Sequence, residues 1–576
     1  MKKLLLVLTL GLTALPAALT VEQRVQDFET LVAVYARQYA PFYWKQQAFG
    51  IDIFDVKNWV ARVKAAKSDL EYHEIANEWV AQLRDGHSRR FLNTNYRADL
   101  GVSVDVYDGK ILIESINRTR YPVARFSFQN GDELLTIDGR PAAEVAREFA
   151  RLRSMGNPST TFRNAVDNLT FRQQASIPRT GELGDTATVT IRRESGEVET
   201  YELPWLKSGI RIGSEIGPIP TPAPFAKAST AVVDPEAWLR DLRTKKAGDD
   251  EGLLSTERNA ETGEMEQRRR VLGWGSRFPV FTFPASLRFE LRRGAAAADF
   301  FYSGVFQFDG QRIGYLRIPS FPSNNVAAVL QQLDADIAFL KANTDGLVLD
   351  LTRNTGGDCI AQDFARRLMT KPFTFGGEHL LATRSNINFA EFSLRSARQQ
   401  NAPQWVIDTF SFLLQALLDA AKDNRALTYA TPTCTPNNVV DPLPTAYDKP
   451  IVFLVDEFTV SFGDFFSAVM QDNDRGLFVG QRTAGWGGSI SGVQYGPFTE
   501  AVSTFTITLD ARAKAIASPD LPTAPFIENI GVIPEVPLEY MTRENLMTRG
   551  QPYLEALARI AADHIRGRRL PTQPVP

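Results

Sequence analysis

Three nearly continuous apolar segments in the C-terminal half of the chain each run directly into a turn of small or polar residues. They lie at 346–351, at 451–455 and just before Gly480. Runs of this kind indicate strands buried on both faces, as in parallel sheets. Helical stretches follow at 359–369 and 462–470, so strand and helix alternate. We therefore predict a layered α/β domain whose ligand site lies at the ends of these strands.

The N-terminus carries a short basic region followed by an apolar stretch. Lys2 and Lys3 precede the apolar run over 4–15, and small residues come after it. This pattern is typical of a secretory signal peptide, and its apolar part is shorter than the roughly 20 residues of a membrane-spanning helix. We expect residues 1–20 to direct export to the periplasm or the extracellular space, and the mature protein to have no stable membrane span.

Composition and charge exclude several function classes. The net charge is −3 and the sequence pI about 6.0, which argues against a nucleic acid partner because phosphate binding needs clustered Lys and Arg. The two cysteines, Cys359 and Cys434, and four histidines show no zinc-ligand spacing, so we expect no metal and no other cofactor. The spacing leaves open whether the two thiols pair or stay buried and reduced.

Residues 99–206 have the pattern of a small β-rich module. Apolar residues alternate over 102–106, and the string Gly131–Gly139 precedes a helix at about 142–152. The string Gly-Asp-x-Leu-Leu-x-Ile-Asp-Gly resembles that of PDZ domains, with residues 155–185 as an insertion. The resemblance implies a loop that binds the carboxylate of a peptide, formed by Leu100, Gly101, Val102 and Ser103.

Ser461 follows one of the apolar segments and stands at the start of a helix. This position exposes the hydroxyl, and a helix N-terminus favours developing negative charge. Acyl transfer also needs a base and amide donors for the oxyanion. The amides of Gly356 or Gly357 and of Phe462 are candidates, because glycine lets the backbone approach a substrate closely. Ser461 with Asp464 also fits an ordinary helix cap, so the serine alone does not indicate an enzyme.

Taken together and in this order, the three strand-end segments resemble those of the tail-specific or C-terminal processing peptidases, which include the tricorn-protease core. The resemblance implies a crotonase-like α/β catalytic domain, a nucleophilic Ser461 and an oxyanion site in the Gly-Gly turn. Members of the family carry a Lys base in the pattern Gly-x-x-Thr-x-Gly-Lys-Gly. The segment 480–487 matches this pattern except that Trp486 occupies the Lys position. The base must therefore come from elsewhere.

The tricorn-like and chlamydial protease-like-activity-factor branches take a His from an Asp-Gly-His-type turn and a Glu from a Glu-Asn-x-Gly-Val string. The counterparts in this sequence are His87 and Glu528. The resemblance thus implies that His87 is the general base for Ser461 and that Glu528 orients His87. Asp510 and Asp520 remain competitors for this third position.

The sequence as a whole predicts a metal-independent, secreted serine endopeptidase that cleaves protein or peptide substrates through an acyl-enzyme on Ser461. Two alternatives stay open: a non-catalytic protein that holds an apolar ligand or a peptide, and a PDZ-centred scaffold with a decayed site. The oligomeric state is unknown. The predicted parts are a signal peptide (1–20), an N-terminal helical domain (21–98), a PDZ-like domain (99–206), an irregular linker or insertion (207–300), a serine peptidase catalytic domain (301–545), and a C-terminal helix and tail (546–576).

Overall fold

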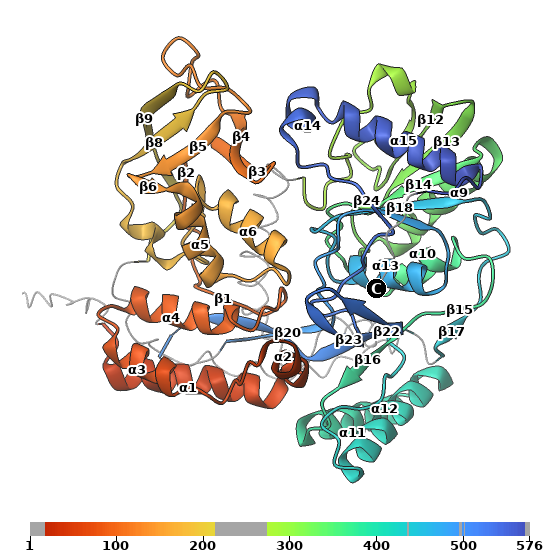
Figure 1. Cartoon of the computed structure of the whole chain (residues 1–576). Coiled ribbons are helices and arrows are strands. Elements are labelled where there is room, and N and C mark those ends of the chain that lie inside the picture. Colours follow the sequence, from red (N-terminus) through yellow and green to blue (C-terminus); the bar gives the residue numbers. More distant parts are fainter. Residues whose placement is uncertain (1–17, 213–272, 435–436, 495–497, 500, 571–576) are drawn as a thin grey trace, which may run out of the picture.

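The computed structural model describes residues 18–212, 273–434, 437–494, 498–499 and 501–570 (Figure 1). Most of the predicted signal peptide, much of the predicted linker and the last six residues lie outside these ranges. Within them, the N-terminal helices and the β-rich module lie on one side of the molecule and the larger α/β part on the other. No helix of this described portion is long and apolar enough to cross a membrane.

The α/β part is built on a seven-stranded sheet. Its strands run parallel from β13 to β24, whereas β11 and β12 are antiparallel. In spatial order the strands are β11 (Glu290–Arg293), β12 (Tyr302–Phe308), β13 (Gln311–Arg317), β14 (Gly346–Asp350), β18 (Ile451–Val455), β19 (Leu477–Gly480) and β24 (Val536–Pro537). The three predicted strands are the neighbours β14, β18 and β19, so their C-terminal ends meet at one edge of the sheet.

Both faces of this sheet are covered by helices. Leu347 and Leu349 face one core, whereas Val348 between them faces the other. Alternate residues of a strand thus enter two different cores, which explains the continuous apolar runs and confirms the layered α/β prediction. One face carries α9 (Val326–Asn343), α10 (Ile360–Arg366) and α13 (Phe462–Asp472), and the other carries α15 (Gln551–Ile565), which follows α14 (Arg543–Thr548).

The β-rich module forms its own sheet, and helix α6 packs against both the edge strand β3 and helix α5. Helix α6 lies within the predicted insertion. The main sheet contains β3 (Val102–Tyr107), β4 (Lys110–Ile116), β5 (Glu133–Ile137), β6 (Arg140–Pro141), β8 (Thr186–Arg192) and β9 (Val198–Pro204), and the helices are α5 (Ala142–Leu152) and α6 (Pro158–Asp167). A second, small sheet joins β10 (Leu206–Ser208), β2 (Arg97–Asp99) and β7 (Phe171–Gln173), and η1 (Pro178–Glu182) follows β7.

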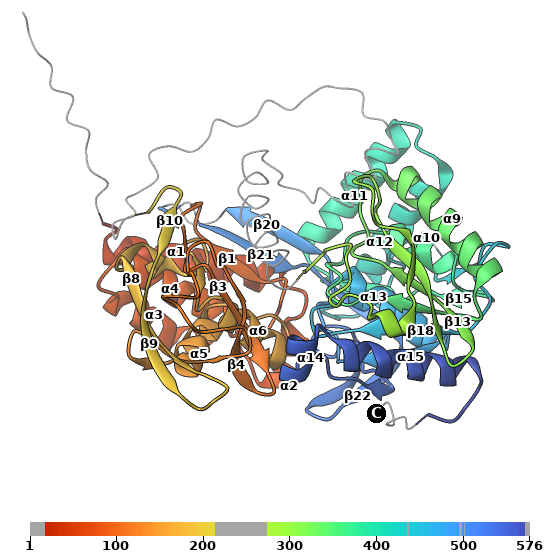
Figure 2. The same cartoon turned by 90° about the horizontal axis from the view of Figure 1, so that it is seen from above.

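The N-terminal helices fold around a strand of the α/β part. Phe505 of β21 lies in their core, with its ring 5.3 Å from that of Tyr35. Strand β1 pairs with β21, which pairs with β20, and Figure 2 shows β20 and β21 beside α1 and β1. The elements are α1 (Val21–Gln38), α2 (Phe42–Phe49), α3 (Lys57–Ala65), α4 (Asp69–Ala81), β1 (Arg89–Phe91), β20 (Ile490–Gln494) and β21 (Val502–Thr506).

A long insertion between α10 and β18 contains a helical hairpin that projects from the α/β part (Figure 1). Its helices are α11 (Arg384–Gln399) and α12 (Gln404–Lys422). The flanking strands are β15 (Phe373–Thr374), which pairs with β17 (Val439–Val440), and β16 (Gly377–Leu380), which pairs with β22 (Thr508–Ser518). Strand β22 also pairs with β23 (Leu521–Phe526), and a short η2 (Ala285–Leu287) precedes β11.

Candidate active site

Ser461 stands in a sharp turn between β18 and α13. Its backbone has φ +56° and ψ −125°, a region that residues other than glycine rarely adopt. A strained strand-to-helix turn is the arrangement by which a nucleophile elbow exposes its side chain. Among the described residues, the Ser461 side chain makes no hydrogen bond that caps the helix. Instead, Ser461 lines a cavity of about 670 Å³, so the ordinary helix-cap interpretation does not describe it.

The loop after β14 lies directly against this turn. A Cβ atom on Gly356, where φ is +79°, would fall 2.5 Å from the Cβ of Ser461, so only glycine fits there. The Gly356 amide donates to Asn354 Oδ1 at 2.8 Å, and the Asn354 carbonyl accepts the Val460 amide at 3.0 Å. These bonds hold the Gly-Gly turn and the nucleophile turn together as one unit.

Two backbone amides remain as candidates for an oxyanion site. Because the Gly356 amide is bonded to a side chain, the amides of Gly357 and Phe462 are the better candidates, and both residues line the cavity with Ser461. Gly357 has φ +141°, and a Cβ there would meet the carbonyl oxygen of Phe321 at 1.8 Å. Phe462 is the first residue of α13, where amides have no partner within the helix.

His87 reaches the same cavity from the N-terminal part of the chain. Its amide donates to Asp85 Oδ1 at 2.8 Å, and its carbonyl accepts the Thr504 hydroxyl at 2.7 Å. The imidazole packs edge-on against the indole of Trp486, with ring centroids 5.3 Å apart. The fold therefore brings together His87 and Ser461, which lie far apart in the sequence.

Trp486 occupies the position where the tail-specific peptidases carry Lys, and it packs against the turn that contains His87. Its indole Nε1 donates to the Met155 carbonyl at 2.8 Å. Its amide donates to Asp464 Oδ2 at 3.0 Å, and burial raises the pKa of the Asp464 carboxyl to about 7. A Cβ on Gly86 would fall 1.9 Å from the indole, so the glycine of the Asp-Gly-His turn makes room for this ring.

Glu528 is fully buried and is not among the residues that line the cavity. It forms an ion pair with Lys45 and accepts the Gly487 amide at 3.1 Å. Burial raises the pKa of Glu528 to about 8, the nearby charge of Asp85 adds to this rise, and Lys45 opposes it. Sequence reasoning missed Lys45, a fully buried residue of α2. The only signal in the sequence is that a charged residue directly follows the aromatic residues 42–44.

The other carboxylates near the site differ in position. Asp510 lines the cavity, whereas Asp520 is exposed and does not. Asp85 is fully buried, and burial raises its pKa. The charges of Lys45 and His87, together with hydrogen bonds from Thr506 and Ser88, outweigh burial and leave the pKa below its usual value. Asp85 therefore stays ionised within electrostatic reach of His87, and it is a further carboxylate that can stabilise an imidazolium.

The predicted carboxylate-binding loop of the β-rich module is engaged in internal contacts. The Leu100 amide donates to the Thr170 carbonyl at 2.9 Å, and the Gly101 amide donates to Asp99 Oδ1 at 2.6 Å. The next residues, Val102 and Ser103, pair with β4. Because α6 also packs on β3, a peptide would have to displace existing contacts, and peptide binding here stays a prediction.

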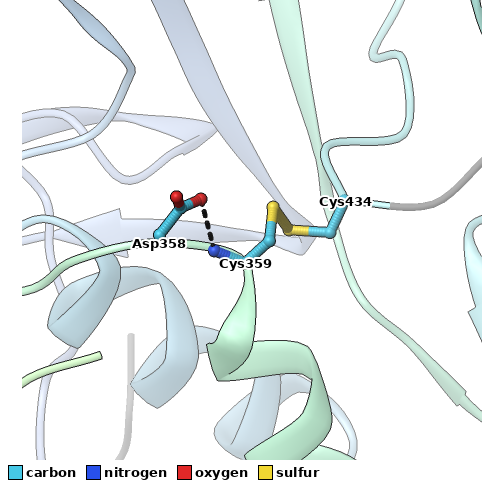
Figure 3. Close-up of a disulfide and its surroundings, with 3 residues drawn as sticks. All are labelled: Asp358, Cys359 and Cys434. Atoms are coloured by element: carbon cyan, nitrogen blue, oxygen red, sulfur yellow. Dashed lines mark hydrogen bonds between the residues drawn. A yellow bond between two sulfur atoms is a disulfide. The ribbon is translucent and has the colours of Figure 1, made fainter. Parts of the chain in front are cut away.

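Cys359 and Cys434 form a disulfide, with Cα atoms 5.5 Å apart (Figure 3). Asp358, next to Gly357, accepts the Cys359 amide at 2.6 Å. The bond links the loop that carries the candidate oxyanion amide to the C-terminal end of the helical insertion. This finding resolves the question of the two thiols that the sequence left open.

Two parts of the chain match known protein families. Residues 312–511 match peptidase family S41, and residues 96–212 match a PDZ domain. A protein of Chlamydia trachomatis serovar D is 23% identical over 95% of this chain and 94% of its own length, and one of Chlamydia pneumoniae is 23% identical over 94% and 90%.

Solved structures of similar fold include two of CPAF. Mature CPAF has a TM-score of 0.72 at 20% identity and covers 95% of this chain and 98% of its own. CPAF complexed with lactacystin has a TM-score of 0.71 at 20% identity, with coverages of 95% and 99%. At this identity the likeness establishes the shared fold. The family matches support a protease function for residues 312–511 and a PDZ domain at residues 96–212.

Proposed function

We propose that this protein is a secreted serine endopeptidase that uses Ser461 as its nucleophile and His87 as its general base. The observation that carries the proposal is that one cavity is lined by a strained, half-buried serine, by a histidine and by the candidate oxyanion residues Gly357 and Phe462. Each of these residues has a role that acyl transfer requires.

The mechanism follows from these roles. His87 takes the proton from the Ser461 hydroxyl as its oxygen attacks the carbonyl carbon of the scissile peptide bond. The amides of Gly357 and Phe462 hold the oxyanion of the tetrahedral intermediate. His87 then gives the proton to the leaving amine, and the acyl-enzyme remains. A water molecule, deprotonated by His87, attacks the ester; His87 then returns the proton to the Ser461 oxygen as the second product, a carboxylic acid, is released.

The buried acidic group behind His87 supports its charged form. We assign this role to Glu528, which accepts the amide of Gly487, the residue after Trp486, whose indole packs against His87. Lys45 favours the ionised form of this carboxylate against the cost of burial. Asp85, ionised and close to His87, adds negative potential to the same region.

Export is the part of the proposal that rests on the N-terminal pattern of residues 1–20. A disulfide between Cys359 and Cys434 fits an oxidising compartment. Expression of the full chain in a bacterial host tests export. We expect a mature protein outside the cytoplasm whose N-terminus begins near residue 20. A full-length protein retained in the cytoplasm would contradict export without affecting the catalytic assignment.

Cleavage of an unfolded protein substrate tests the catalytic assignment. We expect the wild type to digest reduced casein at internal bonds, and Ser461→Ala to lose this activity while keeping its unfolding temperature within a few degrees. Ser323→Ala is the matched control, since Ser323 lines the same cavity but has no assigned role. An active Ser461→Ala variant rejects the nucleophile. A folded wild type without any cleavage would favour a non-catalytic binding protein.

A further inference from the structure

The helical hairpin α11–α12 supplies an apolar wall to the cavity that contains Ser461. On α12, Phe410, Leu413 and Leu417 are three and four residues apart, so they share one face of the helix. Phe412, which also lines the cavity, is 53% exposed although it is aromatic. The apolar lining residues of the hairpin are Phe389, Phe410, Phe412, Leu413 and Leu417.

Another part of the cavity wall is a sheet edge. Ser489, Ile490 and Ser491 line the cavity, and β20 is an outer strand of the sheet β1-β21-β20. An outer strand offers backbone amides and carbonyls to an extended peptide. The cavity thus combines backbone partners for an extended chain with a large apolar surface.

The charged residues that line the cavity indicate which substrate side chains it accepts. Asp358, Glu378 and Asp510 line it, and Arg89 is the single Lys or Arg among the described lining residues. An acidic substrate side chain would meet several carboxylates there, whereas an apolar side chain can bury surface against the hairpin. The disulfide of Cys359 with Cys434 anchors the insertion next to the nucleophile, so this wall keeps its place relative to the scissile bond.

We infer that the apolar face of α11–α12 is a specificity subsite, which selects extended polypeptide segments that carry a large apolar side chain near the scissile bond. The inference rests on the proposed protease function and names the class of substrate for the same site. The occupant is a protein substrate rather than a free lipid, because the cavity also presents a strand edge and the candidate catalytic groups.

Peptide binding to the Ser461→Ala protein tests the subsite without requiring catalysis. Extended peptides are prepared in matched pairs, with Leu or Phe in one member and Ser in the other at each position in turn. Dissociation constants are then measured for the full chain. We expect at least one position at which the apolar member binds about tenfold or more tightly, the range that one buried apolar group provides.

The hairpin itself offers a matched pair of variants. Phe389→Gln with Phe412→Gln changes two lining residues, and Phe392→Gln with Leu418→Gln changes two exposed apolar residues of the same helices that do not line the cavity. We expect the first double variant to lose the apolar preference and the second to keep it, with similar unfolding temperatures for both.

The outcomes separate the two proposals. Absence of an apolar preference in the Ser461→Ala protein, an unchanged preference in the lining variant, or an equal loss in the control variant would overturn the subsite. A wild type that fails to cleave any peptide, while the Ser461→Ala protein still binds with an apolar preference that depends on Phe389 and Phe412, would overturn only the protease assignment.

Discussion

The two sides of the candidate active site are positioned in different ways. Ser461 and the Gly-Gly turn sit at the ends of neighbouring strands of one sheet, and short backbone bonds join their loops. The Val460 amide donates to the Asn354 carbonyl at 3.0 Å, and the Ala484 amide donates to the Thr459 carbonyl at 3.1 Å. The nucleophile side therefore follows from the local order of strands and turns.

The base side depends on contacts between distant parts of the chain. His87 is held because β1 pairs with β21, because Thr504 donates to its carbonyl, and because its ring packs on Trp486. We therefore expect changes on the nucleophile side to abolish catalysis directly. Changes around His87 should act in proportion to how far they move the imidazole.

The largest effect on the base side is expected from His87→Ala. Because nucleophile and base act as a unit, the loss of kcat should approach that of Ser461→Ala, on the order of 10⁴-fold or more. His564→Ala is the control, because His564 lies in α15, which covers the face of the main sheet opposite to α13. The comparison is made by peptide hydrolysis near pH 8. A His87→Ala variant with at least a tenth of wild-type activity would exclude His87 as the base.

A smaller loss of kcat is expected when the His87 side chain is retained but its imidazole is moved. Gly86→Ala places a methyl group in the space of the Trp486 ring, 1.9 Å from its nearest atom. A shift of about 1 Å at a catalytic group can cost about 10²-fold in rate. Gly184→Ala is the matched control, because a Cβ there meets its nearest atom only at 3.8 Å.

The double variant Gly86→Ala with Trp486→Leu sharpens this test. A smaller side chain at residue 486 makes room for the new methyl group, so part of the lost kcat should return. If the single variant is as active as the wild type, or if the double variant is no better than the single one in a folded protein, Trp486 does not position His87.

Glu528→Gln should lower kcat less than Gly86→Ala does, by about tenfold, because the carboxylate only orients and stabilises the imidazolium. The loss of kcat in this variant should depend on pH. Burial raises the pKa of Glu528 to about 8, so the wild-type group is largely protonated at pH 6 and becomes ionised as the pH rises through 8. The activity ratio of wild type to variant, measured from pH 6 to pH 9, should therefore grow with pH. A constant ratio would argue for Asp85 or Asp510 in this role.

The smallest effect on activity is expected from loss of the disulfide. Its closed loop spans a sequence separation of 75 residues, and a bond of this kind adds about 2–4 kcal/mol to the unfolding free energy. Cys359→Ser with Cys434→Ser should lower the unfolding temperature but change kcat/KM only a few-fold, because Asn354 still holds the Gly-Gly turn. Complete loss of activity in a folded variant would mean that the disulfide itself maintains the oxyanion site.

Sequence reasoning succeeded where local patterns determine structure. The apolar runs of β14, β18 and β19 predicted a parallel sheet whose strand ends meet, and the structure confirms the sheet. The position of Ser461 after a strand and before a helix was also visible. The strained backbone of Ser461 was not, because a cap and an elbow share the same sequence pattern and differ only in φ and ψ.

Features that depend on long-range packing could not be predicted from the sequence. Nothing in the helix α2 indicates that Lys45 pairs with Glu528, because that contact forms only when the N-terminal helices dock on the α/β part. The pairing of Cys359 with Cys434 depends on the path of the insertion. The role of Gly86 as space for Trp486 likewise requires both loops to be in place.

Activation of Ser461 by His87 can be tested by the rate at which a fluorophosphonate labels Ser461, measured by mass spectrometry of the intact protein across pH 5 to 11. An imidazole has an ordinary pKa of about 6.5 and a Lys amine about 10.4. We expect a single label on Ser461, a rate that rises in the neutral range with a midpoint of roughly 6–7.5, and almost no labelling in His87→Ala. A rise centred well above pH 8, or a His87→Ala protein labelled at the wild-type rate, would exclude His87 as the base.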